Sequence, residues 1–317
     1  MKDIEGVRKK TKKHTRPINA KRMARIVAIY VAATVLMLYV VGPFAWMTLA
    51  SFKTDKELFS FPPTLLPRNF TTLNYYLIFL TEQAFDMLRR TGDRDPASYY
   101  PTSVRNVLPS MANSFVVGGS IAIINVCFGG IAAYAFARFR FRLKDKIFTT
   151  MFMGRVLPAI AIAIPYYLLI FRLGLFDSLL SLILVYSALT LPFSVFVLQG
   201  YIFGIPGEID EAASIDGASP IQRFLRIMMP LMKPGLVAVI VISFMTAYNE
   251  FFFAYMLTQT PLSQTIPVIE ASMGTQMFIS WTLMNASGVV AAIPPICMLV
   301  IFRRYIISGL TAGSVKR

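Results

Sequence analysis

The chain has 317 residues, a length that would suit two soluble domains, but its composition excludes that class of protein. Hydrophobic residues make up 56% of it and charged residues 15%, whereas a soluble protein has about 25% charged residues. Such a chain cannot cover a water-facing surface with polar side chains. Most of it must therefore face lipid or other membrane helices.

Six apolar stretches are each long enough to cross roughly 30 Å of hydrocarbon, which takes about 20 helical residues. The charged residues inside them are Arg155 and Glu250, and four of the six stretches carry none. Membrane barrels show alternating segments of about ten residues instead, a pattern that this sequence lacks. The sequence therefore predicts an all-α membrane protein, a bundle of six transmembrane helices. The six stretches are Ile26–Ala50, Ser114–Ala137, Ile147–Phe171, Leu179–Phe203, Gly235–Leu257 and Met284–Phe302.

The first stretch is typical of a membrane helix rather than of a cleaved signal peptide. Its apolar run is too long for an h-region of roughly 7–15 residues. Ten Lys or Arg residues precede it within 1–25. We expect a basic cytoplasmic tail over 1–25, a transmembrane domain over 26–306 and a second cytoplasmic tail over 307–317.

The first outer connection, 52–113, is long and divides into parts. A proline-rich part over 61–67 predicts an extended chain. Helical apolar spacing follows over 76–88, and 91–101 is typical of a polar turn region.

A second outer connection, 258–283, carries Glu270 as its single charged residue. Ordered loops of this length commonly bind a partner, and a plain connection is the alternative. Both outer connections are therefore candidate contact regions.

The inner connection 204–234 carries the signals of two helices separated by a turn. Acidic residues follow Pro206, which suits the positive end of a helix dipole. The pair Asp216-Gly217 is a turn signal, because glycine adopts positive φ without steric cost.

The second of these helices has a complete start signal. Ser219 and Gln222 have the spacing of a capping box, with Pro220 at the first helical position. In this interpretation Pro230 and Pro234 end the helix. The connection is thus predicted to be a helix–turn–helix outside the membrane.

The second helix also places four apolar residues on one face at helical spacing. An apolar face on a loop outside the membrane needs a partner. Either it packs against the ends of its own bundle or it docks on another protein, and the spacing favours neither. The four residues are Ile221, Phe224, Leu225 and Met228.

Basic residues divide unequally between the two sides of this topology. With the N-terminus inside, 22 Lys or Arg fall in inner segments and 8 in outer ones. This asymmetry follows the positive-inside rule, so both termini are expected in the cytoplasm. Membrane topology and anionic lipid headgroups then account for the net charge of +15, and nucleic-acid binding is not expected.

Few residues suit catalysis or metal binding. Cys127 and Cys297 lie in different apolar stretches, and the single histidine, His14, lies in the basic tail. No catalytic residue, metal site or disulfide is therefore predicted. The phosphate-binding pattern G-x-x-x-x-G-K-[ST] is absent, so we expect no bound cofactor and no ATP hydrolysis by this chain.

The 204–234 connection resembles the signature loop of ABC importer permeases, and we name it the coupling loop. The family pattern is Glu-Ala-Ala, a following Asp-Gly-Ala, and Phe and Pro at later positions. This chain matches all of its defining positions. The matching residues are Glu211, Ala212, Ala213, Asp216, Gly217, Ala218, Phe224, Pro230 and Pro234.

Three further stretches resemble the carbohydrate-specific branch of that family, the maltose-type permeases of the second-subunit kind. They are 133–141, similar to the second inner loop, 248–251, similar to the fifth helix, and 309–316, similar to the C-terminal tail. The similarity covers nearly the whole chain. It departs over 82–110, where the outer loop is longer than usual, and at Tyr248, where this branch often has Trp.

The resemblance implies a type I ABC importer permease in the inner (cytoplasmic) membrane of a prokaryote. It implies that the coupling loop docks on a dimer of cytoplasmic ATPase subunits, which hold the ATP and Mg. There Glu211 would contact a basic residue, Gly217 would permit the turn, and Phe224 would anchor the apolar face. A second permease subunit and an extracytoplasmic sugar-binding protein are also implied, with a di- or oligosaccharide or a related polyol or glycoside as substrate.

The substrate path is predicted among polar residues of the spans, because a polar side chain facing lipid would be costly. Asn249 is the first candidate, with Tyr248 and Asn285 behind it. Bonding to a neighbouring helix is the alternative for Asn249. Glu250 is better explained as the partner of another helix or of the gate than as a sugar contact.

Two other classes of protein compete with this interpretation. An ion-coupled secondary transporter needs intramembrane ionisable residues and usually has internal repeats. Two isolated charges support that class weakly, and the coupling loop would have no role in it. An intramembrane enzyme would need a catalytic group that the spans lack.

Overall fold

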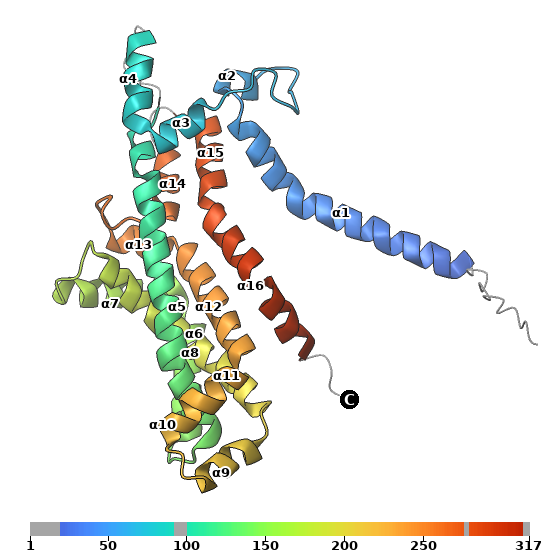
Figure 1. Cartoon of the computed structure of the whole chain (residues 1–317). Helices are drawn as coiled ribbons and strands as arrows, with labels where there is room; N and C mark the ends of the chain where they lie inside the picture. Colours follow the sequence, from blue (N-terminus) through green and yellow to red (C-terminus); the bar gives the residue numbers. More distant parts are fainter. Residues whose placement is uncertain (1–19, 92–99, 276–278, 313–317) are drawn as a thin grey trace, which may run out of the picture. The chain divides into compact units, whose positions relative to one another are not determined.

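The computed structural model describes residues 20–91, 100–275 and 279–312, and every regular element within these ranges is a helix (Figure 1). The all-α prediction is therefore confirmed. The chain divides into two compact units, Met1–Met47 and Thr48–Arg317.

The described part of the first unit, 20–47, belongs to helix α1 (Ala20–Ser51). Its residues Met23–Ser51 have a mean hydropathy of 2.2 and are long and apolar enough to cross a membrane. The expected span Ile26–Ala50 lies inside this helix.

The second unit is built around three helices that pack side by side, α5 (Val107–Arg138), α8 (Leu179–Phe203) and α12 (Lys233–Tyr248) (Figure 1). Helix α8 has the bounds expected for the fourth span. It begins where the Ser178 hydroxyl accepts a hydrogen bond from the Ser181 N–H, which satisfies one of the free donors at a helix start.

A buried polar cluster joins the three helices. The Asn125 side chain, on α5, is 0% exposed. Its amide nitrogen donates to Thr190 Oγ1 on α8 at 2.8 Å and to Ser243 Oγ on α12 at 2.8 Å. Buried polar groups in an apolar surrounding need such partners, so these bonds favour one register of the three helices.

Small residues on α5 allow close packing at the crossings. A Cβ added to Gly118 would lie 2.9 Å from Cδ2 of Phe244, on α12, and one added to Gly129 would lie 3.4 Å from Cβ of Ser194, on α8. Such small positions are what lets apolar membrane helices approach each other.

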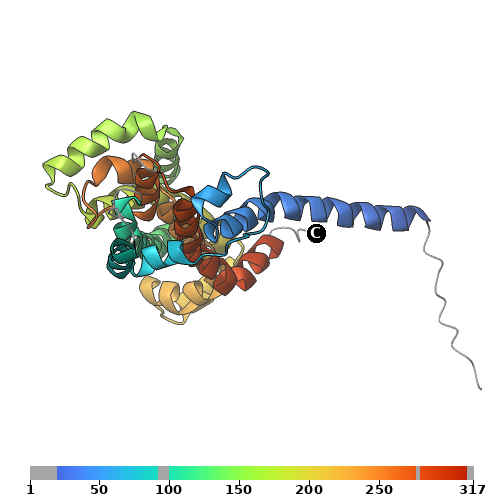
Figure 2. The same ribbon diagram turned by 90° about the horizontal axis from the view of Figure 1, so that it is seen from above.

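The third expected span is not one helix. Helices α6 (Lys144–Val156) and α7 (Ala159–Arg172) meet at an angle of 102°. Pro158 lies at the break, and Leu157 before it is extended, with φ −67° and ψ 129°. Proline lacks an N–H and disfavours a helical residue before it, so the prediction of one straight helix over Ile147–Phe171 was wrong. Helix α7 runs across the direction of α5 in Figure 1 and is again seen lengthwise from above in Figure 2.

The fifth expected span is interrupted as well. Helix α12 ends at Tyr248, and α13 (Phe252–Leu257) begins after a break of three residues. The expectation of a continuous helix over Gly235–Leu257 was therefore wrong in this part. The break holds two of the residues predicted for the substrate path, Asn249 and Glu250.

The sixth expected span, Met284–Phe302, comprises α15 (Trp281–Ala291) and α16 (Ile293–Ala312). Two prolines, Pro294 and Pro295, begin the second of these helices and explain the interruption at Ala292. Trp281–Arg304 is nevertheless apolar enough to cross a membrane. The described chain thus has four candidate spans, or up to six if each bent helix pair is one span.

The outer connection 52–113 contains the helices expected over 76–88, though in two pieces, α3 (Leu73–Phe79) and α4 (Thr81–Thr91). The proline-rich part 61–67 has no helix, as predicted. Of the expected polar turn, residues 92–99 lie outside the described chain. Three short elements lie in the two long connections 52–113 and 258–283: α2 (Asp55–Leu58), η2 (Thr102–Asn106) and α14 (Ile266–Met273).

The packing at Gly118 makes a testable prediction. Gly118→Ala adds a methyl group against a fully buried ring, and overpacking of this kind costs about 1–3 kcal/mol of stability. Gly119→Ala is the matched control, because nothing lies within 4 Å of a Cβ added there. Thermal unfolding of the purified protein should show a lower midpoint for Gly118→Ala and an unchanged or higher one for Gly119→Ala. Equal midpoints for the two variants would contradict the packing.

Candidate functional site

The coupling loop folds as the predicted helix–turn–helix. Its first helix is α9 (Gly207–Ile215), and the turn contains Gly217 with φ +80°. The second part begins at α10 (Pro220–Arg223) with both hydrogen bonds of the predicted capping box. The Gln222 N–H donates to Ser219 Oγ at 3.3 Å, and the Ser219 N–H donates to Gln222 Oε1 at 2.9 Å.

The end of the second helix differs from the prediction. The chain stays helical through η3 (Phe224–Met228) and α11 (Met229–Leu231), so Pro230 lies inside the helix rather than ending it. In η3 the Met229 N–H bonds to the Phe224 carbonyl, one residue further back than in an α-helix. This wider turn accommodates a proline, which has no N–H to donate. The helix ends at Met232, where the chain bends by 80° into α12.

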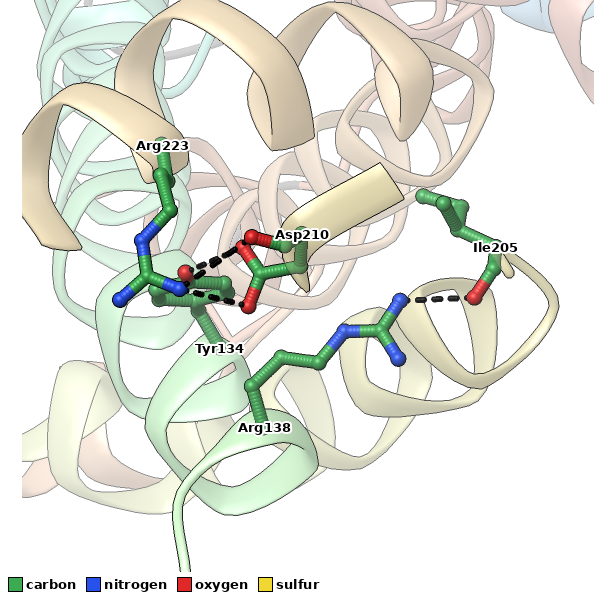
Figure 3. A network of polar contacts seen from close by, with 5 residues as sticks. All are labelled: Tyr134, Arg138, Ile205, Asp210 and Arg223. Carbon is green, nitrogen blue, oxygen red and sulfur yellow. Dashed lines mark hydrogen bonds and ion pairs between the residues drawn. The ribbon is translucent and has the colours of Figure 1, made fainter. Parts of the chain in front are cut away.

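A buried network of polar side chains fastens the coupling loop to α5 (Figure 3). The Tyr134 hydroxyl, on α5, donates to Asp210 Oδ1 at 2.8 Å. Arg223 Nη1 lies 3.2 Å from Asp210 Oδ2, and the side chains of this ion pair are 14% and 10% exposed. One carboxylate therefore connects α9, α10 and the end of α5.

A second arginine holds the start of the loop. Arg138, the last residue of α5, donates from Nη2 to the carbonyl oxygen of Ile205 at 2.7 Å (Figure 3). The same nitrogen donates to the Ile202 carbonyl at 3.3 Å. Ile202 is in the last turn of α8 and Ile205 follows the helix, so the Arg138 guanidinium adds a donor at a helix end, where carbonyls lack part of their helical partners. A cation there also suits the negative end of the helix dipole.

The apolar face of the second helix divides between two surroundings. Phe224 and Met228 are 7% and 0% exposed, and the Phe224 ring lies 5.5 Å from that of Tyr134. Ile221 and Leu225 are 71% and 53% exposed. Phe224 thus packs in the core of its own chain. The expectation that it anchors a face open to another protein was wrong. The physical reason is that Gly130 of α5 leaves room for its ring, since a Cβ added to Gly130 would lie 3.3 Å from it.

The first helix and the turn after it expose most residues of the Glu-Ala-Ala and Asp-Gly-Ala signature. Glu211, Ala212, Asp216 and Gly217 are exposed, Ala218 is half-buried, and Ala213 is buried. Ile215, one turn after Glu211, is 87% exposed. We name one exposed carboxylate of the loop and four of its exposed apolar side chains the coupling surface. It consists of Glu211, Ala212, Ile215, Ile221 and Leu225.

Tyr248 lies in the core. Its hydroxyl donates to the Ala291 carbonyl, on α15, at 2.9 Å, and its ring stacks on that of Phe244 at 5.5 Å. Tyr248 therefore joins two helices and does not line an open path, in contrast to the sequence-based expectation. The reason is that the α12 helix directs it toward α15.

Glu250 partners another helix, as predicted. Its carboxylate accepts hydrogen bonds from the N–H groups of Phe253 and Ala254 at 3.1 to 3.2 Å, which caps the start of α13. It also accepts a short hydrogen bond from the Tyr186 hydroxyl of α8. A carboxylate at a helix start is favourable, so Glu250 stabilises the break in the fifth span.

Of the two asparagines of the predicted path, Asn249 directly follows α12 and Asn285 lies within α15. Asn249 is exposed at the break, with its amide nitrogen donating to the Met245 carbonyl at 2.9 Å. Asn285 is half-buried and donates in the same way to the Trp281 carbonyl at 2.7 Å. Phe251, Phe252 and Tyr255 are also exposed near Asn249 in sequence.

Sequence reasoning missed the network around Asp210. Tyr134 and Arg138 are one turn apart at the end of an apolar stretch, a spacing that places both on one face of α5. That spacing was the one signal in the sequence for a polar contact at this end of α5. Their acceptors lie more than sixty positions further along the chain.

Comparison with known proteins identifies the family. The binding-protein-dependent transport system inner membrane component family matches residues 125–310, which include α8, the coupling loop and the fifth and sixth spans. The chain belongs to this family. It is an inner membrane permease subunit of an ABC importer that works with a binding protein.

Named relatives span nearly the whole permease. The inner membrane ABC transporter permease protein YcjP of Escherichia coli (strain K12) is 33% identical, with 94% of this chain and 99% of that protein covered. The trehalose/maltose transport system permease protein MalG of Thermococcus litoralis is 30% identical, with 92% and 96% covered. A crystal structure of a bacterial ABC transporter for the import of the acidic polysaccharide alginate has the same fold, with a TM-score of 0.71 over 91% of this chain and 98% of that one, at 20% identity.

The Asp210 network predicts how firmly the coupling loop is held. Asp210→Ala leaves the Arg223 guanidinium buried without its carboxylate, and breaking a buried pair costs about 3–5 kcal/mol. Glu208→Ala is the matched control, because Glu208 is exposed on the same helix. Limited proteolysis of the purified permease should cut the loop of Asp210→Ala much faster than that of the wild type or of Glu208→Ala. Unchanged cutting of Asp210→Ala would show that the network does not hold the loop.

Proposed function

We propose that the permease forms half of the membrane pathway of an ATP-driven importer for a sugar, a di- or oligosaccharide or a related polyol or glycoside. The names of its relatives support this substrate class. They include transport system permeases for trehalose and maltose in Thermococcus litoralis and for trehalose in Mycobacterium tuberculosis. A second permease subunit would form the other half, and an extracytoplasmic binding protein would deliver the sugar.

Both termini and the coupling loop face the cytoplasm in this proposal. The division of 22 and 8 basic residues between the two sides supports this orientation. The coupling loop then lies on the side where ATP is available.

ATP hydrolysis is assigned to a partner. The chain lacks the phosphate-binding pattern of such enzymes, so a dimer of ATPase subunits would hold ATP and Mg. The coupling surface is the proposed contact. Its apolar side chains, Ile215, Ile221 and Leu225, are more than half exposed and suit a groove on another protein. Glu211 beside them suits a basic residue of that groove.

The main support for this mechanism is the buried Asp210 network, which ties the loop to α5 while the coupling surface stays exposed. Because Asp210 bonds to Tyr134 and Arg223, α9 and α10 are tied to each other and to α5. A displacement of the coupling surface would therefore move α5 with it. Helix α5 packs along α8 and α12, so the displacement would reach the core of the membrane domain.

The proposed sugar path passes the break in the fifth span. Asn249 is exposed there and carries an amide that can pair with hydroxyl groups. The aromatic rings of Phe251 and Tyr255, stacked at 5.4 Å, are exposed close to it in sequence. Aromatic faces and amides together suit a sugar, which has both apolar C–H faces and hydroxyl groups.

An ion-coupled secondary transporter is the alternative function. The coupling ion would have to bind at Arg155 or Glu250, the two charged residues within the predicted spans. Glu250 is engaged as the cap of α13, and the Arg155 guanidinium lies 4.3 Å from the centre of the Phe193 ring. Uptake into proteoliposomes that runs on an ion gradient without ATP would favour this alternative over the proposed function.

Glu211 and Gly217 test the docking. Glu211→Lys reverses a charge at the contact, which costs several kcal/mol where like charges meet, so ATP-driven uptake should fall at least about tenfold. Gly217→Val places a β-branched residue at φ +80° and should block uptake as well. Gly217→Asn is the control, because asparagine tolerates this conformation, and it should retain uptake. The measurement is uptake per permease molecule in the membrane.

Wild-type uptake by a blocking variant that is present in the membrane at the normal level would contradict the docking role assigned to that residue. Loss of membrane insertion in Gly217→Val alone would leave Glu211→Lys to decide.

Asn249→Ala tests the sugar path. In proteoliposomes it should lose most of its sugar uptake while ATPase stimulation by the binding protein is retained, because a path contact acts after docking. Tyr248→Phe is the control, since it removes only a hydrogen bond within the core. It should lower the thermal midpoint and leave the ratio of uptake to ATPase activity unchanged. If Asn249→Ala loses both activities, or neither, Asn249 does not belong to the path.

A further inference from the structure

Two adjoining hollows lie where α5 ends and the chain turns into α6. The first has a volume of about 470 Å³ and is lined by Arg140, Phe141, Leu143, Lys144, Asp145 and Lys146. The second has a volume of about 340 Å³ and is lined by Leu143, Lys146, Ile147, Thr150 and Met151. Leu143 and Lys146 belong to both linings, so the hollows share a wall.

The first hollow is basic. Three of its residues, Arg140, Lys144 and Lys146, are cationic, and one, Asp145, is anionic. Within the described chain none of the three cations forms an ion pair with a carboxylate. Three cations around one hollow repel one another, and an anion placed among them would relieve this repulsion.

The second hollow is largely apolar and runs along the next turns of α6. Ile147 on its wall is 44% exposed, and no residue of α6 is buried by the rest of the described chain. An apolar hollow directly beside a basic one suits a ligand that has an anionic head and a hydrocarbon tail.

The wall between the hollows has an unusual backbone. Leu143 has φ +70°, in the left-handed region that residues other than glycine rarely adopt. Its neighbours are held in place by aromatic packing, because the Phe141 ring lies 5.5 Å from that of Phe136, and Phe136 lies 5.5 Å from Phe148 of α6. Strained residues held by their surroundings gather at binding sites.

We propose that these two hollows form a site for one phospholipid with an anionic headgroup, which we name the α5–α6 lipid site. The phosphate would lie among Arg140, Lys144 and Lys146, and an acyl chain would lie along Ile147 and Met151. A lipid fits better than a free phosphate, because only a lipid would also fill the apolar hollow. The site does not depend on which solute the permease transports.

The bound lipid would also lie close to Arg138, which connects α5 to the start of the coupling loop. Arg138, two residues before Arg140, holds the Ile202 and Ile205 carbonyls at the start of that loop. A bound lipid would therefore restrain the end of α5, whose Arg138 side chain contacts the start of the coupling loop.

Native mass spectrometry of the assembled transporter tests the site by titration with phosphatidylglycerol. The variant is Arg140→Gln/Lys146→Gln, and Arg142→Gln is the matched control, because Arg142 lies in the same turn but lines neither hollow. Each basic side chain near an anionic lipid contributes enough to change affinity about fivefold. The double variant should therefore bind the first phosphatidylglycerol about 25-fold more weakly, and Arg142→Gln should match the wild type.

Two further measurements separate the possible ligands. Ile147→Asn should weaken lipid binding without changing the basic wall, and millimolar inorganic phosphate should not displace the lipid. Equal losses in Arg142→Gln and the double variant would mean diffuse surface charge and overturn the site. Three other results would overturn the site as well. They are full lipid binding by the double variant, displacement of the lipid by phosphate, and lipid binding only after the ATPase subunits dissociate.

Discussion

The carboxylate of Asp210 is the interaction on which the proposed coupling mechanism depends. A buried carboxylate is unfavourable unless it is paired and hydrogen-bonded, and here Arg223 and Tyr134 satisfy both of its oxygens. Each partner comes from a different helix, so the requirement to pair one charge holds α9, α10 and α5 in one arrangement. In the proposed mechanism this network transmits displacement, because neither α9 nor α10 could move alone without separating the buried Asp210–Arg223 pair.

The coupling loop consequently has two faces with different roles. Phe224 and Met228 are buried against α5 and the neighbouring helices, and they add apolar packing to the Asp210 network. Ile215, Ile221 and Leu225 remain exposed on the outer face. One face packs on the membrane domain, and the other is exposed and is the proposed contact for the ATPase subunit. A family signature within this loop therefore contains residues of both kinds, and their burial separates them.

Interruptions of the membrane helices follow the same constraint of satisfying polar groups. Within a membrane, irregular backbone is tolerated where neighbouring groups supply its hydrogen bonds. At the break in the fifth span the Glu250 carboxylate accepts bonds from two N–H groups of α13 and from Tyr186 of α8. At the end of α8 the Arg138 guanidinium bonds to the carbonyls of Ile202 and Ile205. Glu250 and Arg138 thus each stabilise a helix end.

Local patterns in the sequence were sufficient for the membrane class, the positions of the apolar stretches and the helix–turn–helix with its capping box, because these depend on residues a few positions apart. Resemblance in that loop also pointed to the family. Tertiary structure alone decided that Phe224 faces inward and that Asp210 joins Tyr134, 76 positions away. It also decided that the chain breaks at Pro158, since a proline in an apolar stretch can kink a helix or end it according to its neighbours. The physical reason is that a side chain's partner depends on which helices meet, and spacing along one helix does not contain that information.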